Sequence, residues 1–235
     1  MEKEVNALGQ PVGLPVPDWR PCPRPDGRPL QGRTCRLERL DPAHAEALYA
    51  ADRADTDGRS WTYLPYGPFQ TPADYRDWMA RFLGAEDPFF YAILGAETGQ
   101  PVGVASYLRI APEAGSIEVG HIHYSPALQR TVAATEAMAL MMAHVFEDLG
   151  YRRYEWKCNA LNAASCRAAE RLGFTFEGIF RQAGVYKGRN RDTAWFSILD
   201  REWPGAKRAF AAWLDPGNFD DDGTQRARLE DLRAG

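Results

Sequence analysis

The fold is decided by the segment SIEVGHIHYSPALQRTVAATEAMALMMAHVFEDL, residues 116–149. Residues 116–124 predict a strand, and the residues from Thr131 onward predict a long helix that is apolar around nearly its whole circumference. A strand that turns directly into a helix leaves the first N–H groups of the helix without partners and directs the positive end of the helix dipole out of the turn. The segment therefore predicts an anion site at this turn.

The residues at the mouth of the turn are small or carry hydrogen-bond donors. They are Gln129, Arg130, Thr131, Val132, Ala133 and Ala134. Small side chains let a pyrophosphate approach the backbone N–H groups, and a neighbouring arginine supplies a positive charge. The turn therefore predicts a nucleotide-like cofactor.

The composition is typical of one α/β domain with extensions. Of the 235 residues, 45% are hydrophobic and 12% aromatic, which is enough for a packed core. The net charge of -4 gives no electrostatic reason to expect nucleic acid as a direct ligand. The four cysteines fit neither a zinc site nor a disulfide framework, and the sequence shows no signal peptide or long apolar run. We therefore expect a soluble, cytoplasmic protein without a metal or a membrane partner.

Two extensions flank the predicted domain, which spans residues 31–205. Residues 1–30 form a proline-rich arm that can be neither a helix nor an interior strand. Trp19 within the arm favours docking onto the domain, although the composition is nearly as compatible with a flexible tail. Residues 206–235 contribute the rest of a short helix that begins at Trp203, followed by a polar tail from Asp215 that we expect to be poorly ordered.

The domain itself is predicted to be built from about seven strands and four helices. The strands are residues 34–40, 88–96, 102–110, 116–124, 151–159, 174–186 and 192–200, and the helices are residues 41–53, 71–83, 131–149 and 162–172. The strands at 88–124 form an antiparallel meander. The aromatic loop 54–70 is interpreted either as a substrate lid or as a plug at the end of the core.

This order of elements, with a cofactor-like turn after the fourth strand, resembles the GNAT superfamily of acetyl-CoA-dependent N-acetyltransferases over about residues 30–205. The second half is similar to the RimJ/RimL-type branch (ribosomal-protein alanine N-acetyltransferases), whose members carry Gln-x-x-Gly-x-Ala, Thr-Glu-Ala, Asn-x-x-Ser and Leu-Gly-Phe. The matching residues are Gln129, Val132, Ala134, Thr135-Glu136-Ala137, Asn162, Ser165 and Leu172-Gly173-Phe174. The resemblance implies an α/β (α+β) GNAT fold, in which a mixed, mostly antiparallel sheet is flanked by helices and splayed at the cofactor site.

The chain departs from the branch at Val132, which occupies the position of the turn glycine. Valine fits there if the position has helical dihedrals, but its side chain must then point away from the phosphates. If it does not, cofactor binding is weakened.

The resemblance also implies roles for individual residues. Backbone amides from about Arg130 to Ala134 hold the CoA pyrophosphate, Asn162 contacts the pantetheine arm, and Ser165 lies near the sulfur, where it assists the leaving thiolate. Asn162 and Ser165 equally describe an N-cap and its N3 residue. The oxyanion of the tetrahedral intermediate is stabilised by a backbone N–H around His123 or Tyr124.

Glu118 is the candidate general base, because a carboxylate inside an apolar strand beside the turn is shielded and its pKa is raised. The alternative is a structural glutamate paired with an arginine. His121 and His123 have the spacing of some metal ligands, but no third ligand is evident and we expect packed histidines. We expect Cys166 to be a buried thiol, and the run KGRNR (187–191) fits either a grip on an acidic substrate or a solvated hairpin tip.

The sequence thus predicts an N-acetyltransferase that moves an acetyl group from acetyl-CoA to a primary amine by direct attack in a ternary complex. The acceptor is a protein N-terminus or a small amine, and acetyl-CoA serves as co-substrate. The alternative is a non-catalytic module of the same fold that binds CoA or another ligand. The sequence makes no prediction of oligomeric state.

Overall fold

The computed structural model describes residues 3–234, and its centre is an eight-stranded sheet with the order β3-β4-β5-β6-β7-β8-β10-β9. All neighbouring strands are antiparallel except β7 and β8, which are parallel. The predicted α/β fold and order of elements are therefore confirmed. The structure adds one strand, Leu30–Gln31, which spans the predicted boundary between the arm and the domain and pairs with β4.

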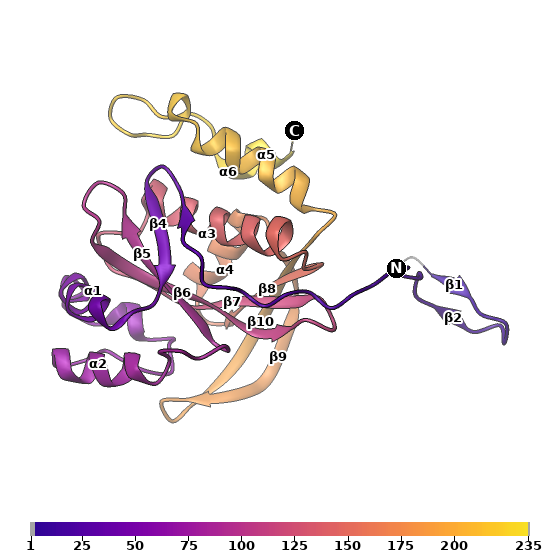
Figure 1. The fold of residues 1–235 in the computed structure, drawn as a ribbon, viewed down its shortest axis with the longest axis horizontal. Coiled ribbons are helices and arrows are strands. Elements are labelled where there is room, and N and C mark those ends of the chain that lie inside the picture. The colour runs from indigo at the N-terminus through magenta and orange to yellow at the C-terminus, as the bar shows by residue number, and fades with distance from the viewer. Residues whose placement is uncertain (1–2, 235) are drawn as a thin grey trace.

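The elements lie along the chain as follows (Figure 1). The strands are β1 (Glu4–Val5), β2 (Pro11–Val12), β3 (Leu30–Gln31), β4 (Cys35–Arg39), β5 (Phe89–Gly95), β6 (Pro101–Ala111), β7 (Ser116–Tyr124), β8 (Arg153–Asn159), β9 (Thr175–Tyr186) and β10 (Arg189–Leu199). The α-helices are α1 (Ala45–Asp52), α2 (Pro72–Ala80), α3 (Val132–Ala143), α4 (Ala163–Leu172), α5 (Trp203–Leu214) and α6 (Leu229–Ala234).

Each face of the sheet carries its own apolar core. Helices α1 and α2 cover one face, where Trp61 and the α2 residue Trp78 lie in the core, and α3, α4 and α5 cover the other (Figure 1). Helix α3 lies deep against the sheet, as its apolar circumference predicts, since Met141 and Met142 are fully buried. It continues into one π-helical turn, His144–Asp148, so the predicted span to Leu149 is helical nearly throughout.

The proline-rich arm docks onto the domain through Trp19 and Cys22. The Trp19 indole N–H donates to the Glu113 carbonyl oxygen at 2.9 Å. The Cys22 N–H donates to the Pro112 carbonyl oxygen at 3.2 Å, and the Cys22 thiol donates to that of Gly150 at 3.3 Å. Strands β1 and β2 form a separate two-stranded ribbon that projects away from the domain (Figure 1).

The expectation of a poorly ordered tail after Asp215 is wrong. Leu229, at the start of α6, is fully buried, and the Trp213 indole N–H donates to Gln225 Oε1 at 2.7 Å. The Arg233 side chain donates to the carbonyl oxygen of Glu170 in α4 at 3.0 Å. One buried leucine and these hydrogen bonds attach a segment whose average composition is polar.

The sheet opens between its two parallel strands. Pairing of β7 with β8 runs from Ser116↔Arg153 to Val119↔Trp156, although both strands continue beyond this point. A bulge at His121, where φ is +49°, bends β7 at the same place. The predicted splay is therefore present. None of the described helices combines the length and the apolar character needed to cross a bilayer.

Candidate functional site

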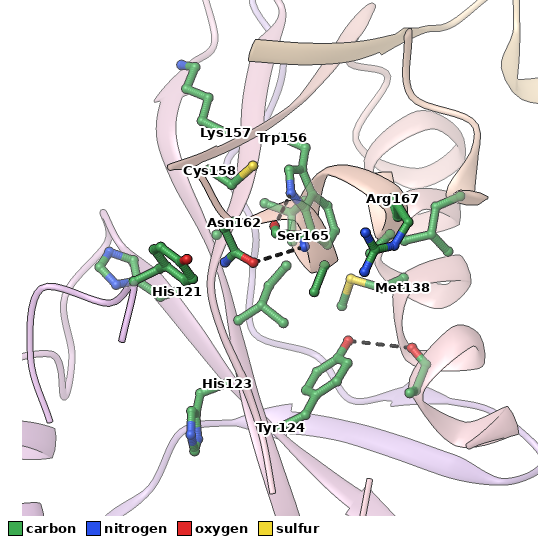
Figure 2. A pocket seen from close by; sticks show the side chains of 18 of the residues that line it. His121, His123, Tyr124, Met138, Trp156, Lys157, Cys158, Asn162, Ser165 and Arg167 are labelled. Atoms are coloured by element: carbon green, nitrogen blue, oxygen red, sulfur yellow. Dashed lines mark hydrogen bonds between the residues drawn. The ribbon is translucent and has the colours of Figure 1, made fainter. Parts of the chain in front are cut away.

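A cavity of about 1190 Å³ lies where β7 and β8 separate. The starts of α3 and α4 border it on one side, and the segment 59–65 and the hairpin β9–β10 border it on the other. All the predicted cofactor and catalytic residues line this cavity except Ala133: Glu118, His123, Tyr124, Gln129, Arg130, Thr131, Val132, Ala134, Asn162 and Ser165. Figure 2 shows those that lie around the gap between the strands.

The turn before α3 is held by its own side chains. Gln129 Nε2 donates to the Tyr124 carbonyl oxygen at 2.8 Å, which ties the turn to the end of β7. Thr131 is the N-cap, and its Oγ1 accepts from the Ala134 N–H at 3.2 Å. The capping threonine takes up the third N–H of the helix and leaves the first two, of Val132 and Ala133, without an intrahelical partner. These amides and the helix dipole provide an anion site.

Val132 is the first helical residue, and the left-handed conformation of the turn falls on Arg130, where φ is +63°. The valine side chain packs against the core on the α3 face of the sheet. This is the arrangement in which a valine fits without strain, because the turn requires no left-handed φ at its position.

Cations line the cavity near the same turn. Arg130, just before α3, and Arg167, within α4, are exposed there. Arg171 is more buried, and its Nη1 donates to Thr135 Oγ1 at 3.1 Å. Burial lowers the pKa of Arg171. Three arginines beside a helix N-terminus suit a ligand that carries several phosphates.

Ser165 has both of the arrangements that the sequence leaves open. The Asn162 Oδ1 accepts from the Ser165 N–H at 3.1 Å, which is the N-cap of α4 (Figure 2). The Ser165 Oγ accepts from the Trp156 indole N–H at 3.0 Å. Because that oxygen already accepts from the indole, its own proton is available to a group in the cavity. Trp156 was not predicted, since nothing local in the sequence indicates which oxygen its indole meets.

His123 belongs to a buried network under the segment 59–65. Its Nε2 lies 2.8 Å from Ser60 Oγ and its Nδ1 3.4 Å from Asp52 Oδ1, and its ring stacks on Trp61 at a centroid distance of 3.5 Å. Burial lowers the pKa of His123 to about 3, so the ring is neutral. Tyr124 points to the other face, where its hydroxyl donates to the Ala134 carbonyl oxygen at 3.5 Å.

His121 has a different partner, since its Nδ1 lies 2.8 Å from the Tyr66 hydroxyl. Burial, followed by the charges of Arg109 and Arg191, lowers the pKa of His121 to about 4. The two histidines therefore contact different groups and do not converge on one point. Among the described residues, no three potential ligands gather where a metal ion could be held.

Glu118 is buried, with a side chain only 3% exposed, and it is paired with two cations. Arg109 Nη1 donates to its Oε2 at 2.8 Å, and Lys157 Nζ lies 2.9 Å from the same oxygen. Burial is the largest influence and raises the pKa of Glu118, against the effect of Lys157 and Arg109. No described residue donates a hydrogen bond to Oε1, which lies next to Gly120. The pairing with an arginine, which is the structural alternative to a base, is present, and one carboxylate oxygen remains available.

The aromatic loop contributes to both the core and the cavity. Trp61 is buried in the core under α1 and α2, whereas Ser60, Tyr63 and Leu64 line the cavity. The Lys187 ammonium, at the tip of the β9–β10 hairpin, donates to the Trp61 carbonyl oxygen at 2.8 Å. The hairpin tip and the loop therefore meet beside the cavity.

Two cysteines lie next to the serine. Cys158 Sγ is 3.5 Å from Cys166 Sγ, and burial raises the pKa of Cys158 to about 12. Cys166 is only partly buried, so the expectation of a buried thiol describes Cys158 better.

Residues 35–175 match the acetyltransferase (GNAT) domain family, which is more than half of the chain. The chain belongs to the GNAT acetyltransferase family. The resemblance found in the sequence is confirmed at this level, and the protein is an acetyltransferase whose family transfers acetyl groups from acetyl-CoA.

This acetyltransferase is similar to several known proteins. A GCN5-related N-acetyltransferase from Brucella melitensis is 45% identical, with a TM-score of 0.92 and coverage of 94% of this chain and 100% of that one. The uncharacterised N-acetyltransferase p20 of Bacillus licheniformis is 29% identical over 179 residues, which are 73% of this chain and 95% of p20. RimL, a ribosomal L7/L12 alpha-N-protein acetyltransferase solved with coenzyme A, shares the fold at 20% identity and a TM-score of 0.62, over 73% of this chain and 98% of RimL.

Proposed function

We propose that this acetyltransferase moves an acetyl group from acetyl-CoA to a primary amine by direct attack in a ternary complex. The observation that carries the proposal is the single cavity that joins the anion site before α3, the Ser165 hydroxyl and the free oxygen of Glu118. A cavity bordered by both the cofactor turn and the aromatic loop admits two ligands together, as direct transfer requires.

CoA fits the chain's own residues along this cavity. The pyrophosphate would be bound by the free amides at the start of α3, with Arg130 and Arg167 beside it. The pantetheine arm would lie in the gap between β7 and β8, near Asn162, where the two strands leave backbone groups unpaired. This placement brings the sulfur to the start of α4.

Glu118 and Ser165 would lie on opposite sides of the thioester, the first near the attacking amine and the second near the departing sulfur. Glu118 Oε1 would take the proton of the attacking amine, directly or through a water molecule, while Lys157 and Arg109 hold the other oxygen. Ser165 would donate a hydrogen bond from its hydroxyl to the departing thiolate and keep its own proton, with its oxygen fixed by the Trp156 indole. A backbone N–H of β7 around His123 or Tyr124 would stabilise the oxyanion.

The acceptor proposed from the RimJ/RimL-type likeness is a protein N-terminus, or a small amine that reaches the same position. The rival function is a module of this fold that binds CoA and does not transfer acetyl groups. Val132, which departs from the sequence pattern of the branch, is not an argument for that rival, because the left-handed φ of the turn falls on Arg130 and not on the valine.

The test combines binding with turnover. Saturating CoA at a hundred times its dissociation constant should stabilise the native state by about 2.7 kcal/mol, seen as a rise in melting temperature. Release of free thiol from acetyl-CoA, measured across N-terminal peptides and small amines, should depend on both acetyl-CoA and one class of amine. Stabilisation by CoA without thiol release for any amine would favour the binding module, and no stabilisation would remove the cofactor assignment.

A further inference from the structure

The cavity wall has a strong excess of positive charge. Its lining includes one carboxylate, Glu118, and seven cationic side chains: Arg59, Arg109, Arg130, Lys157, Arg167, Arg171 and Arg191. A primary amine is itself a cation at neutral pH, so a wall of this sign repels a simple amine. We propose that the amine acceptor carries a carboxylate close to its amino group, and that Arg191 binds that carboxylate. This inference rests on the proposed acetyl transfer.

Most of the cations already have a partner or a place at the phosphate end. Lys157 lies between Glu118 and Glu155, at 2.9 and 2.7 Å, with its ammonium 3.5 Å from the centre of the Trp195 ring. Arg59 is paired with Asp57. Three cations lie beside the anion site: Arg130 just before α3, and Arg167 and Arg171 within α4. Arg109 and Arg191 remain at the acceptor end.

Arg191 is held in place without an acidic partner. Its guanidinium carbon lies 4.4 Å from the centre of the Tyr186 ring, and its Nε donates to Thr193 Oγ1 at 3.2 Å. No described carboxylate lies within ion-pair distance of it. A guanidinium fixed by stacking and by its Nε leaves its two terminal nitrogens free for a bidentate bond to a carboxylate.

Arg109 and Arg191 approach the same region from opposite sides of the open strands. Arg109 comes from β6 and Arg191 from β10, with β7 and β8 between them. After burial, the charges of these two arginines are the groups that lower the pKa of His121, which lies at the bulge where the sheet opens. Arg109 is satisfied through Glu118, whereas Arg191 has no such counter-charge. An acceptor that places its amine toward Glu118 and a carboxylate toward Arg191 gives each of these two side chains a group of opposite charge.

The carboxylate has two sources that share this chemistry, a free amino acid or an acidic side chain next to a protein N-terminus. Two matched pairs of acceptors distinguish them: an amino acid against its amide, and a peptide beginning Ser-Asp against one beginning Ser-Asn. We expect kcat/KM to be about tenfold higher for the acid of at least one pair. Arg191→Gln should bring the ratio within that pair close to one and leave the affinity for CoA unchanged.

Arg181→Gln is the matched control, because Arg181 is an exposed arginine of the same hairpin that does not line the cavity. It should keep the preference of the parent. A second readout needs no turnover: in the presence of CoA, the acid should raise the melting temperature of the parent more than its amide does, and should lose this advantage in Arg191→Gln. Acetylation of acid and amide at equal rates, or a preference that survives in Arg191→Gln, overturns the inference and leaves the proposed transfer intact. Acid-selective stabilisation without acetylation of any amine contradicts the proposed transfer and supports the carboxylate site.

Discussion

Replacement of Glu118 by glutamine tests its role as the base, because the amide keeps the shape of the side chain and removes its basicity. The fold should tolerate the change. Lys157 keeps Glu155 at 2.7 Å, and Arg109 has a side chain that is 57% exposed and regains water. The amide oxygen can still accept from one of the two cations, so we expect the free energy of unfolding to fall by about 1–3 kcal/mol.

Glu118→Gln should affect the rate of acetyl transfer much more than it affects the stability of the fold. Loss of a general base typically lowers the rate by about 10² to 10⁴. Burial raises the pKa of Glu118 despite its cationic neighbours, so the acidic limb of the parent's pH–rate profile should lie above 4.5, the ordinary pKa of a glutamate. The rate of the parent should fall as the pH drops through this limb, because the protonated carboxyl accepts no proton. In Glu118→Gln the limb should be absent.

The matched control is Glu155→Gln. Glu155 contacts the same lysine, and Arg153 at 2.6 Å, but it does not line the cavity. We expect its rate to stay within about threefold of the parent, since no proton transfer depends on it. Thiol release from acetyl-CoA over a range of pH gives both profiles, and thermal melts with CoA confirm that each variant binds the cofactor. A rate within threefold of the parent and an unchanged acidic limb in Glu118→Gln would show that water or another residue is the base.

Three further predictions concern the cofactor side and the core. Ser165→Ala should lower the rate of acetyl transfer by about ten- to a hundredfold, because one neutral hydrogen-bond donor to a tolerable leaving group is lost. Trp156→Phe should reproduce part of this loss in the same thiol-release assay. An unchanged rate in both variants would exclude a role for the Ser165 hydroxyl in the reaction. Val132→Gly should leave CoA affinity within a few fold and destabilise the helix by about 1 kcal/mol, whereas tighter binding by more than tenfold in a titration would mean that the valine crowds the phosphates. Glu136→Gln should lower the free energy of unfolding by about 3 kcal/mol or more in a urea titration. Glu136 Oε2 accepts from the Thr34 N–H, the Thr34 hydroxyl and the Cys35 N–H at 2.6, 2.5 and 3.0 Å, and an amide N–H₂ group cannot accept these bonds. A loss below 1 kcal/mol would refute this prediction.

The pH dependence of stability gives Glu136 a second test. Burial alone would raise its pKa, but the hydrogen bonds from residues 33–35 lower it below the ordinary value of 4.5. A carboxyl with a lowered folded pKa contributes stability above its unfolded pKa and loses that contribution as the pH falls through the folded pKa. The parent should therefore lose stability below about pH 4.5 more steeply than Glu136→Gln does.

The parts of the site that were predictable from the sequence depend on short segments. A strand, a turn and a helix at residues 116–149 fix the anion site through local geometry, and a polar residue three positions after Asn162 predicts the cap of α4. The order of strands and helices follows from the same local periodicity. The two-residue strand β3 lies in a proline-rich segment and is too short for a period to be recognised.

The parts that were not predictable depend on strands that meet far apart in the chain. Lys157 reaches Glu118 only because β7 and β8 pair in parallel, with Glu118 opposite Glu155. Ser60 reaches His123 across 63 residues. The order of the tail was mispredicted because an average over polar residues hides the contribution of a single buried leucine, Leu229.

The docked arm has a consequence for the order in which the chain is made. Trp19 and Glu113 are separated by 94 residues, and Cys22 and Gly150 by 128, so the docking surface of the arm leaves the ribosome long after the arm itself. At about 5–20 residues per second, the later of these partners is synthesised roughly 6 to 25 s after Cys22. During that interval the arm is exposed to other nascent chains. The seven prolines of the arm, from Pro11 to Pro29, lower the risk of aggregation during this interval. A backbone that lacks these N–H donors is a poor template for intermolecular strand pairing.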